Sequence, residues 1–522
     1  MGRQGRDKTV PSDYVRLEGM LRRLSLIDSC PQARESTDRV AAFSRQGAPM
    51  RTLLAVLAAV LQICVTSSVS ADDAMRPNIV YVLADDAGLA DFGAFGGRLI
   101  QTPSIDRLAS EGMRFDRHYA GSTVCAPSRS VLMTGKHSGH TRIRGNARAS
   151  LRAEDVTVAE VLQAQGYATA LIGKWGLGDH ASPGAPDRKG FDHFFGYLDQ
   201  ERAHRYYPEF LWRNREKTEY PGNPEVRTRY SHDEMTREAL AFIERSQDGP
   251  FFLYLAYTIP HAELDVPADS MAPYHNAFDP ETPFTWWRHP LDWSAYHYRG
   301  QQTPKAAYAG MISRLDRDIG RILDRLEALG LDERTIVMFA SDNGRATEGG
   351  SAAAFFLGDL PLRGTKRDYY EGGIRTPFVI HWPGTVAPGS ATDHLSAFQD
   401  ILPTFAELAG APLPDDIDGI SLAPTLLGEP ERQVAHGHLY WEWPGVAGRF
   451  GAAQAIRMGR WKLLRRKRWL RSPSVELYDL DADPREERDL SADQPELVMD
   501  LIARMDREHL PSAEFPLAFY DE

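Results

Sequence analysis

The sequence predicts an α/β fold: a large, mostly parallel sheet sandwiched by helices, with a smaller C-terminal antiparallel subdomain. Strand-like apolar runs alternate with helix-like segments from residue 77 to about residue 410. These runs are continuously apolar, which is typical of strands that are buried on both faces of a parallel sheet. After Asp418 and Gly419 the apolar runs become shorter and alternate with polar residues, which indicates antiparallel strands.

The predicted strands of the large sheet are rich in β-branched and aromatic residues. They lie at residues 77–84, 168–172, 251–257, 335–340 and 377–382. The predicted helices begin either at a Thr-Pro pair or at a capping box, in which Ser or Thr precedes Glu by three residues. They lie at residues 102–112, 157–166, 231–244 and 303–330, and the capping boxes are Thr157 with Glu160 and Ser231 with Glu234.

Residues 180–230 and the aromatic segment after His261 lack sustained periodicity, which predicts two long surface insertions. Residues 435–480 with the helix-like segment 495–509 predict the antiparallel subdomain and its packing helix. Aromatic side chains of these regions suit either stacking on sugar rings or packing in the core, and both alternatives stay open. They are Tyr206, Tyr207, Trp212, Trp286, Trp287, Trp293, Tyr440, Trp441 and Trp443.

The segment that starts at Met50 has the composition of a secretory signal peptide. Met50-Arg51 is followed by an apolar run at residues 53–65 and by small residues up to Ala71. The run is too short to span a bilayer comfortably, and Ile63 before Cys64 does not fit a lipoprotein signal, so no stable membrane anchor is expected. We therefore expect residues 1–49 to be an over-extended reading frame, residues 50–71 to be removed, and the mature protein to be periplasmic or secreted.

Composition narrows the classes of partner. The 522 residues contain 42% hydrophobic residues, enough for a large core, and carry a formal net charge of −12. An acidic chain is a poor candidate for binding nucleic acid, although a local basic pocket for an anionic substrate remains compatible with it. Of the three cysteines only Cys125 lies in the predicted mature chain, so no internal disulfide is expected there.

Polar side chains follow four predicted strands at the point where each strand ends. They are Asp85, Asp86, Lys174, His261, Asp342 and Asn343. Each could be a helix cap or a turn residue, but ligands of open α/β sheets bind beyond the carboxyl ends of the strands, so one shared site is expected. Its three carboxylates and one amide oxygen suit a hard divalent cation, Ca²⁺ first and Mg²⁺ second.

The stretch Cys125-Ala126-Pro127-Ser128-Arg129 resembles the Cys-x-Pro-Ser-Arg signature of the type I, formylglycine-dependent sulfatases, which have an alkaline-phosphatase-like fold. Four further segments resemble motifs of that family in the same order. They are the metal loop at residues 85–91, the strand-end lysine motif at 172–175, the second metal loop at 341–344, and the lysine segment comprising Lys366 and residues 371–377.

The resemblance implies that a maturase oxidises Cys125 to formylglycine. One hydroxyl group of the formylglycine hydrate attacks the sulfur atom, and the substrate alcohol leaves. The second hydroxyl group then loses its proton, and sulfate is eliminated as the aldehyde forms again. Asp85, Asp86, Asp342, Asn343 and modified Cys125 are implied to hold the ion, and Arg129 to fix the hydrate. Lys174, Lys366 and His261 are implied to bind the sulfate, and His261 or Lys366 to protonate the leaving alcohol.

The chain departs from the family pattern at Gly176, where many members have a histidine that contacts the hydrate. His137, His180 and His204 are candidates to replace it, and water with the chemistry of the aldehyde is the alternative. We expect His204 to belong to the substrate site.

A sulfated saccharide is the leading substrate class, with aryl sulfates second. A formylglycine-dependent phosphonate or phosphodiester hydrolase is the rival enzyme, because a metal and cationic side chains also serve phosphoryl transfer. A non-catalytic saccharide-binding protein is the alternative from another class. The sequence thus predicts a catalytic domain at residues 72–420 and an α+β subdomain at residues 421–522.

Overall fold

The computed structural model describes residues 76–146, 149–285, 298–358, 362–445, 451–467 and 472–520. The chain from Arg76 onward forms one compact unit. The predicted extension at residues 1–49, the predicted signal peptide and the side chains of Trp286, Trp287 and Trp293 lie outside the described residues. Within the described part of the chain, no helix is both long enough and apolar enough to cross a bilayer.

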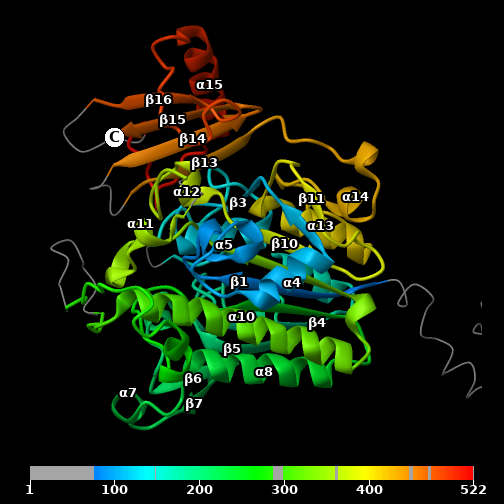
Figure 1. Cartoon of the computed structure of the whole chain (residues 1–522). Coiled ribbons are helices and arrows are strands. Elements are labelled where there is room, and N and C mark those ends of the chain that lie inside the picture. Colours follow the sequence, from blue (N-terminus) through cyan, green and yellow to red (C-terminus); the bar gives the residue numbers. More distant parts are fainter. Residues whose placement is uncertain are drawn as a thin grey trace, which may run out of the picture. The chain divides into compact units, whose positions relative to one another are not determined.

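A large sheet forms the centre of this unit (Figure 1). Among the described residues it has ten strands in the order β11-β2-β10-β9-β1-β8-β4-β5-β6-β7. Strands β9, β1, β8, β4 and β5 are mutually parallel, whereas β10 is antiparallel to β9. The strands are β1 (Asn78–Ala84), β2 (Met113–Phe115), β4 (Ala168–Lys174), β5 (His193–Tyr197), β6 (Phe210–Arg213), β7 (Glu216–Glu219), β8 (Phe251–Ala256), β9 (Thr335–Ser341), β10 (Phe378–His381) and β11 (Ser390–Thr392).

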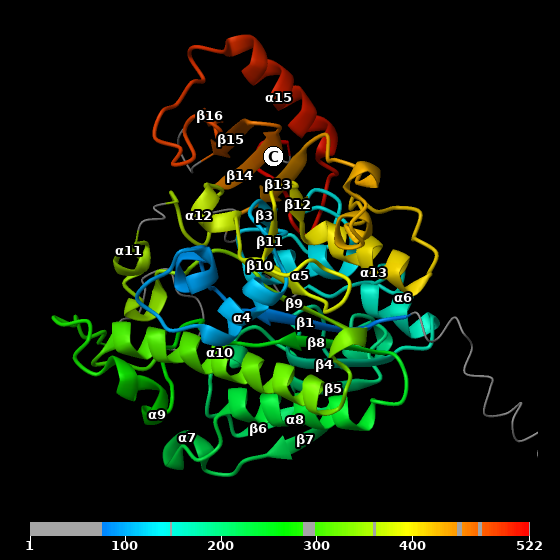
Figure 2. The ribbon, with the colours of Figure 1, turned by 45° about the vertical axis from the view of Figure 1, so that its right-hand side comes forward.

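Helices cover both faces of this sheet, and Figure 2 shows them as separate layers. Alternate side chains of β1 enter different cores: Val80 and Val82 pack with α4, α8 and α10, whereas Tyr81 and Leu83 pack with α5, α6 and α13. This is the two-sided burial expected of a continuously apolar strand. The helices are α4 (Pro103–Glu111), α5 (Cys125–Thr134), α6 (Val158–Ala164), α8 (Ser231–Arg245), α10 (Pro304–Ala328) and α13 (Ile401–Ala409).

A smaller antiparallel sheet follows toward the C-terminus. Its strands are β13 (Leu439–Trp443), β14 (Ala452–Met458), β15 (Trp461–Lys467) and β16 (Ser474–Asp479), and α15 (Pro495–Glu508) packs on it. Leu501 and Met505 of α15 lie against Ile456 of β14. The other face of this sheet packs on the main domain, where Lys462 forms a buried ion pair with Glu371 at 2.8 Å.

The remaining short elements connect these layers. They are β3 (His118–Tyr119), β12 (Ser396–Ala397), α7 (Asn223–Val226), α9 (Ala268–Met271), α11 (Ala353–Phe356), α12 (Glu371–Ile374), α14 (Ala423–Leu426) and the single-turn 3₁₀ helix η6 (Arg202–His204).

The predicted fold class is confirmed, and so are the five predicted strands of the large sheet. The capping box of α6 is also confirmed, because Glu160 N–H donates to Thr157 Oγ1 at 3.3 Å and Thr157 N–H donates to Glu160 Oε2 at 2.8 Å. The predicted capping box of α8 is wrong. Ser231 is the first helical residue rather than the cap, and Glu234 pairs with Arg237 instead.

The prediction that residues 180–230 form only a surface insertion is also wrong. They contain β5, which pairs in parallel with β4 of the large sheet, and the hairpin β6–β7. Phe194 and Phe195 of β5 are buried on opposite faces. The strand is only five residues long and includes Gly196, so its sequence carries too little periodicity to stand out.

Candidate active site

The carboxyl ends of the parallel strands bring the predicted polar residues together. Asp85 and Asp86 directly follow β1, Lys174 is the last residue of β4, and Asp342 directly follows β9. Asp342 N–H donates to the carbonyl of Ala84 at 3.1 Å, which holds the two aspartate-bearing loops together. All of these carboxylates are buried, so their charges must be compensated within the site.

Cys125 lies at the centre of this group as the first residue of α5. Its thiol is 1% exposed and lies 3.5 Å from Asp85 Oδ1. Burial, reinforced by the negative charge of Asp85, raises the pKa of the Cys125 thiol to about 12. The unmodified side chain is therefore a protonated thiol at neutral pH and a poor nucleophile.

Arg129 lies one helical turn after Cys125 and is completely buried. Its Nε and Nη2 atoms donate to Asp342 Oδ2 at 3.1 and 2.8 Å, and Nη1 donates to the carbonyl of Lys174 at 3.0 Å. The guanidinium thus joins helix α5 to the ends of β9 and β4. This arrangement determines the position of residue 125 relative to the strand ends.

Two lysines each form an ion pair with one aspartate. Lys174 Nζ lies 2.7 Å from Asp85 Oδ2, and Lys366 Nζ lies 2.7 Å from Asp86 Oδ2. Burial alone would raise the pKa of Asp85, but the positive charges of Lys174, Arg129 and Lys366 hold it well below its usual value. Burial and the neighbouring Asp85 raise the pKa of Asp342 to about 6, a sign of unrelieved repulsion among the carboxylates.

His261 lies in the loop after β8 and contacts both partners of the second ion pair. Lys366 Nζ donates to His261 Nε2 at 3.0 Å, while His261 Nδ1 bonds to the carbonyl of Ala262. A lysine ammonium only donates and a carbonyl only accepts, so the proton of this imidazole is on Nδ1. Burial and the charge of Lys366 lower the pKa of His261 to about 3, which keeps it neutral.

The donor set fits a divalent cation. One ligand atom from each of Asp85, Asp86, Cys125 and His261 lies within 4.8 Å of the others. Asn343 Nδ2 donates to Asp86 Oδ1 at 2.7 Å, and its buried Oδ1 has no partner among the described residues. A buried amide oxygen without a donor, next to carboxylates that repel each other, is what a hard cation would satisfy.

The structure indicates why residue 176 is a glycine and which histidine lies near Lys174 instead. Gly176 has φ 74°, which is strained for any other residue, and a Cβ there would lie 1.8 Å from Gln200 Nε2, so a side chain would also require Gln200 to move. Of the three candidate histidines, His204 alone enters the cluster: its Nε2 lies 3.5 Å from Lys174 Nζ. Its ring stacks on that of His261 with 3.6 Å between centroids.

The other two candidate histidines are engaged elsewhere. His137 Nε2 binds Glu508 Oε2 at 3.1 Å, and the ring of His180 packs edge-on against Trp212. The histidine nearest to Lys174 thus comes from η6, twenty-eight residues beyond Gly176 in the chain.

Sequence reasoning missed two groups of the site. Asn146 accepts a hydrogen bond at its Oδ1 from Ala126 N–H at 3.0 Å, next to Cys125. The ring centroid of Tyr298 lies 6.3 Å from that of His204 and 6.4 Å from that of His261. Nothing in the sequence distinguishes this asparagine, and Tyr298 was only one of several aromatic residues in its segment.

Four of the six aromatic candidates that the structure describes belong to the core. Tyr206, Tyr440, Trp441 and Trp443 are buried, so the core-packing alternative holds for these residues. Tyr207 and Trp212 are partly exposed.

Comparisons with known proteins agree with this arrangement. A family model described as Sulfatase matches residues 77–411, and one described as N-sulphoglucosamine sulphohydrolase, C-terminal, matches residues 364–510. The chain is 32% identical over 491 residues to human arylsulfatase A, covering 87% of this chain and 85% of that protein. It is 30% identical over 391 residues to mouse N-acetylgalactosamine-6-sulfatase, covering 67% of this chain and 66%, just under two thirds, of that protein.

A solved structure shares the fold along most of the chain. It is the crystal structure of Ps i-CgsB in complex with k-i-k-neocarrahexaose, with a TM-score of 0.68 and 28% identity over 83% of this chain and 92% of that chain. The alkaline-phosphatase-like fold implied by the signature around Cys125 is thereby confirmed. Because a family model covers more than half of the sequence, and because the signature stands in the same order with the other motifs, the chain belongs to the sulfatase family.

Proposed function

We propose that this protein hydrolyses sulfate esters of saccharides, with residue 125 as the reacting residue. The observation that carries the proposal is the position of Cys125 beside Asp85, in the buried cluster where Lys174 pairs with Asp85 and Lys366 pairs with Asp86. Its thiol is protonated and enclosed, so it is poorly suited to act as a cysteine nucleophile. Conversion to formylglycine supplies a hydrate with two hydroxyl groups in place of the thiol.

A divalent cation, Ca²⁺ in preference to Mg²⁺, is part of the proposal. Asp85, Asp86, Asp342 and Asn343 would hold it, together with modified residue 125. When bound, the ion supplies positive charge that polarises its oxygen ligands. The unpartnered Asn343 Oδ1 and the repulsion at Asp342 support this assignment.

The remaining side chains bind the sulfate and move protons. Lys174 and Lys366 would bind sulfate oxygens, because both ammonium groups already face the carboxylates around residue 125. Lys366 Nζ and His261 Nε2 lie within hydrogen-bond distance, so a proton held between them is available to the departing alcohol. Arg129 holds α5 in position during the reaction through its hydrogen bond to Asp342.

Saccharides are the proposed substrates for two reasons. One relative is an N-acetylgalactosamine-6-sulfatase, and one solved relative is in complex with neocarrahexaose. His204 would contact the substrate from η6, because it stacks on His261 and reaches Lys174.

A formylglycine-generating maturase is the proposed partner. The predicted signal peptide supports the proposal that the protein is exported and acts outside the cytoplasm.

The experiment requires protein that has been matured. The chain is produced with a formylglycine-generating maturase, and the peptide containing residue 125 is weighed by mass spectrometry. We expect the aldehyde there, and turnover of 4-nitrophenyl sulfate and of 6-sulfated amino sugars that exceeds turnover of an aryl phosphate diester. Cys125→Ala should abolish turnover with cooperative unfolding retained. Full activity with unmodified cysteine, or dominant phosphodiesterase activity, would contradict the proposal.

A further inference from the structure

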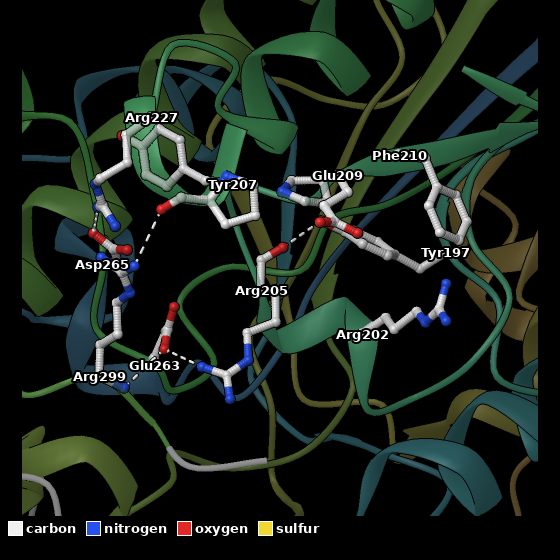
Figure 3. A pocket seen from close by; sticks show the side chains of 12 residues that line it. Tyr197, Arg202, Arg205, Tyr207, Glu209, Phe210, Arg227, Glu263, Asp265 and Arg299 are labelled. Atoms are coloured by element: carbon white, nitrogen blue, oxygen red, sulfur yellow. Dashed lines mark hydrogen bonds and ion pairs between the residues drawn. The ribbon is translucent and has the colours of Figure 1, made fainter. Parts of the chain in front are cut away.

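A pocket of 410 Å³ is lined by residues that neighbour the candidate active site in the chain (Figure 3). Its wall is formed by residues between Tyr197 and Phe210, by Pro224 and Arg227, by Glu263 and Asp265, and by Arg299. This volume lies within the usual range of about 300–1,000 Å³ for small-molecule sites. None of the residues assigned above to the sulfate or the metal lines it.

The pocket and the active site share three segments of backbone. Arg205 directly follows His204, Arg299 directly follows Tyr298, and Glu263 lies two residues beyond His261. Consecutive Cα atoms are about 3.8 Å apart, so the wall of the pocket begins within one or two residues of the groups around the sulfate. These three segments therefore place the wall of the pocket close to the groups around the sulfate.

Two arginines of the wall are neutralised within it. Arg205 Nη1 lies 2.5 Å from Glu263 Oε2, and Arg227 forms an ion pair with Asp265. Figure 3 shows these pairs on the side of the pocket that also carries Arg299. Their charges cancel, and they hold the loop 263–265 against the segments that carry the arginines.

The other two arginines have at most a long, exposed ion pair with a carboxylate of the described residues. The guanidinium of Arg299 donates to the carbonyl of Pro224 at 3.1 Å and forms no ion pair with a carboxylate of the described residues. Arg202 lies 3.9 Å from Asp199 and places its guanidinium 4.7 Å from the ring centroid of Phe210, with 48% of its side chain exposed. Both can therefore bind an anionic group that enters the pocket.

The rest of the wall combines aromatic and acidic side chains. Tyr207 and Phe210 are partly exposed, and Arg227 lies over the ring of Tyr207 while Arg202 lies over the ring of Phe210. Asp265 Oδ2 is buried and accepts no hydrogen bond from the described residues. A hydroxyl group that donates to this oxygen would satisfy it.

We infer that this pocket binds a second, anionic saccharide unit of the substrate, next to the unit whose sulfate ester lies at residue 125. Arg202 and Arg299 bind the carboxylate or sulfate of the second unit, and Asp265 accepts from one of its hydroxyl groups. The inference rests on the proposed function, and it adds that the preferred substrate is an oligosaccharide charged on more than one unit.

The test compares short and long inhibitors. Hydrolysis of 4-nitrophenyl sulfate by matured enzyme is inhibited either by N-acetylglucosamine 6-sulfate or by tetrasaccharides of chondroitin 6-sulfate and of heparin. In wild type we expect at least one tetrasaccharide to inhibit about ten-fold more strongly than the monosaccharide, because two charge-assisted contacts are added. Arg202→Ala, Arg299→Ala and the double variant should lose most of this difference.

The matched control is Arg215→Ala. Arg215 is an exposed arginine on the nearby β6–β7 turn, outside the pocket, paired with Asp187 at 2.6 Å, and its substitution should leave the difference intact. Equal inhibition by short and long probes in wild type, or an undiminished difference in the double variant, would overturn the inference. Absence of sulfatase activity would instead refute the proposed function, and calorimetric titration of the same protein with the tetrasaccharides would still test the pocket.

Discussion

Lys366 Nζ donates to His261 Nε2 at 3.0 Å, although the two residues are 105 positions apart in the chain. Lys366 also pairs with Asp86 at 2.7 Å, so a single ammonium group connects a carboxylate of the metal cluster to an imidazole. Asp86 and nearby acids hold the pKa of Lys366 well above its usual value, against the effect of burial. Lys366 can therefore both bind the sulfate and share a proton with His261, and substitution of Lys366 tests this role.

Replacing Lys366 by Ala should lower kcat for 4-nitrophenyl sulfate by roughly 10²–10³-fold, the usual cost of losing one preorganised electrostatic group. The variant also leaves the buried Asp86 without its partner. Lys217→Ala is the control, because Lys217 is exposed on β7, and its turnover should match wild type. Turnover of Lys366→Ala within three-fold of wild type would show that Lys366 does not act on the sulfate.

Unmodified Cys125 should be almost inert toward iodoacetamide in the folded protein. With a pKa of about 12, the thiol at pH 8 contains on the order of 10³-fold less thiolate than an ordinary cysteine of pKa about 8.5. Protein made without maturase is alkylated with and without guanidinium, and the peptide containing residue 125 is quantified by mass spectrometry. Rapid labelling of the native protein would contradict the enclosed, protonated thiol.

Calcium should stabilise the folded protein, and chelation should remove this effect. Binding of a cation to the native state alone raises the free energy of unfolding by RT ln(1 + [L]/Kd), about 2.7 kcal/mol at a hundred-fold excess over Kd. Thermal unfolding is followed with EDTA, Ca²⁺ or Mg²⁺, and we expect the largest rise in Tm with Ca²⁺.

The variant Asp342→Asn tests whether the predicted ligands are responsible. It removes one of three close carboxylates and should abolish most of the response to Ca²⁺. Asp416→Asn changes an exposed carboxylate paired with Lys136 and should keep the response. An unaltered response in Asp342→Asn would place the ion elsewhere.

The docking of the C-terminal sheet should weaken in acid through Glu371. Burial alone would raise the pKa of Glu371, but Lys462, Arg457 and Arg375 lower it to about 2. A lowered pKa stabilises the folded state above the unfolded value of 4.5, and this contribution is lost as the pH falls from 4.5 toward 2. The shift corresponds to about 3 kcal/mol.

Chemical unfolding of wild type and Glu371→Gln between pH 7 and pH 2.5 measures this contribution. The difference in the free energy of unfolding should be largest above pH 5 and should shrink below pH 4.5. Glu219→Gln, on an exposed position of β7, should differ little from wild type at every pH. A difference that is constant over this range would show that ionisation of Glu371 does not stabilise the fold.

Much of the fold was predictable because its signals are local. The strands at residues 78–84 and 335–341 are continuous apolar runs, and the apolar face of α10 repeats with helical spacing. Strand β5 was not predictable, since five residues that include a glycine carry no clear period. The capping box of α8 was wrongly predicted because Ser231 with Glu234 matches the motif, whereas Glu234 pairs with Arg237 one turn further along the same helix.

The sequence by itself determined the chemistry of the site: the identity of Cys125 and Arg129, the oxygen donors, and the strand ends that carry them. Only the tertiary structure decided which histidine lies beside Lys174 and that Tyr206, Tyr440, Trp441 and Trp443 are core residues. The physical reason is that a strand end is a local feature of the chain, whereas the stacking of His204 on His261 depends on how distant loops pack together. The same packing formed the pocket beside them, whose arginines have no distinguishing pattern in the sequence.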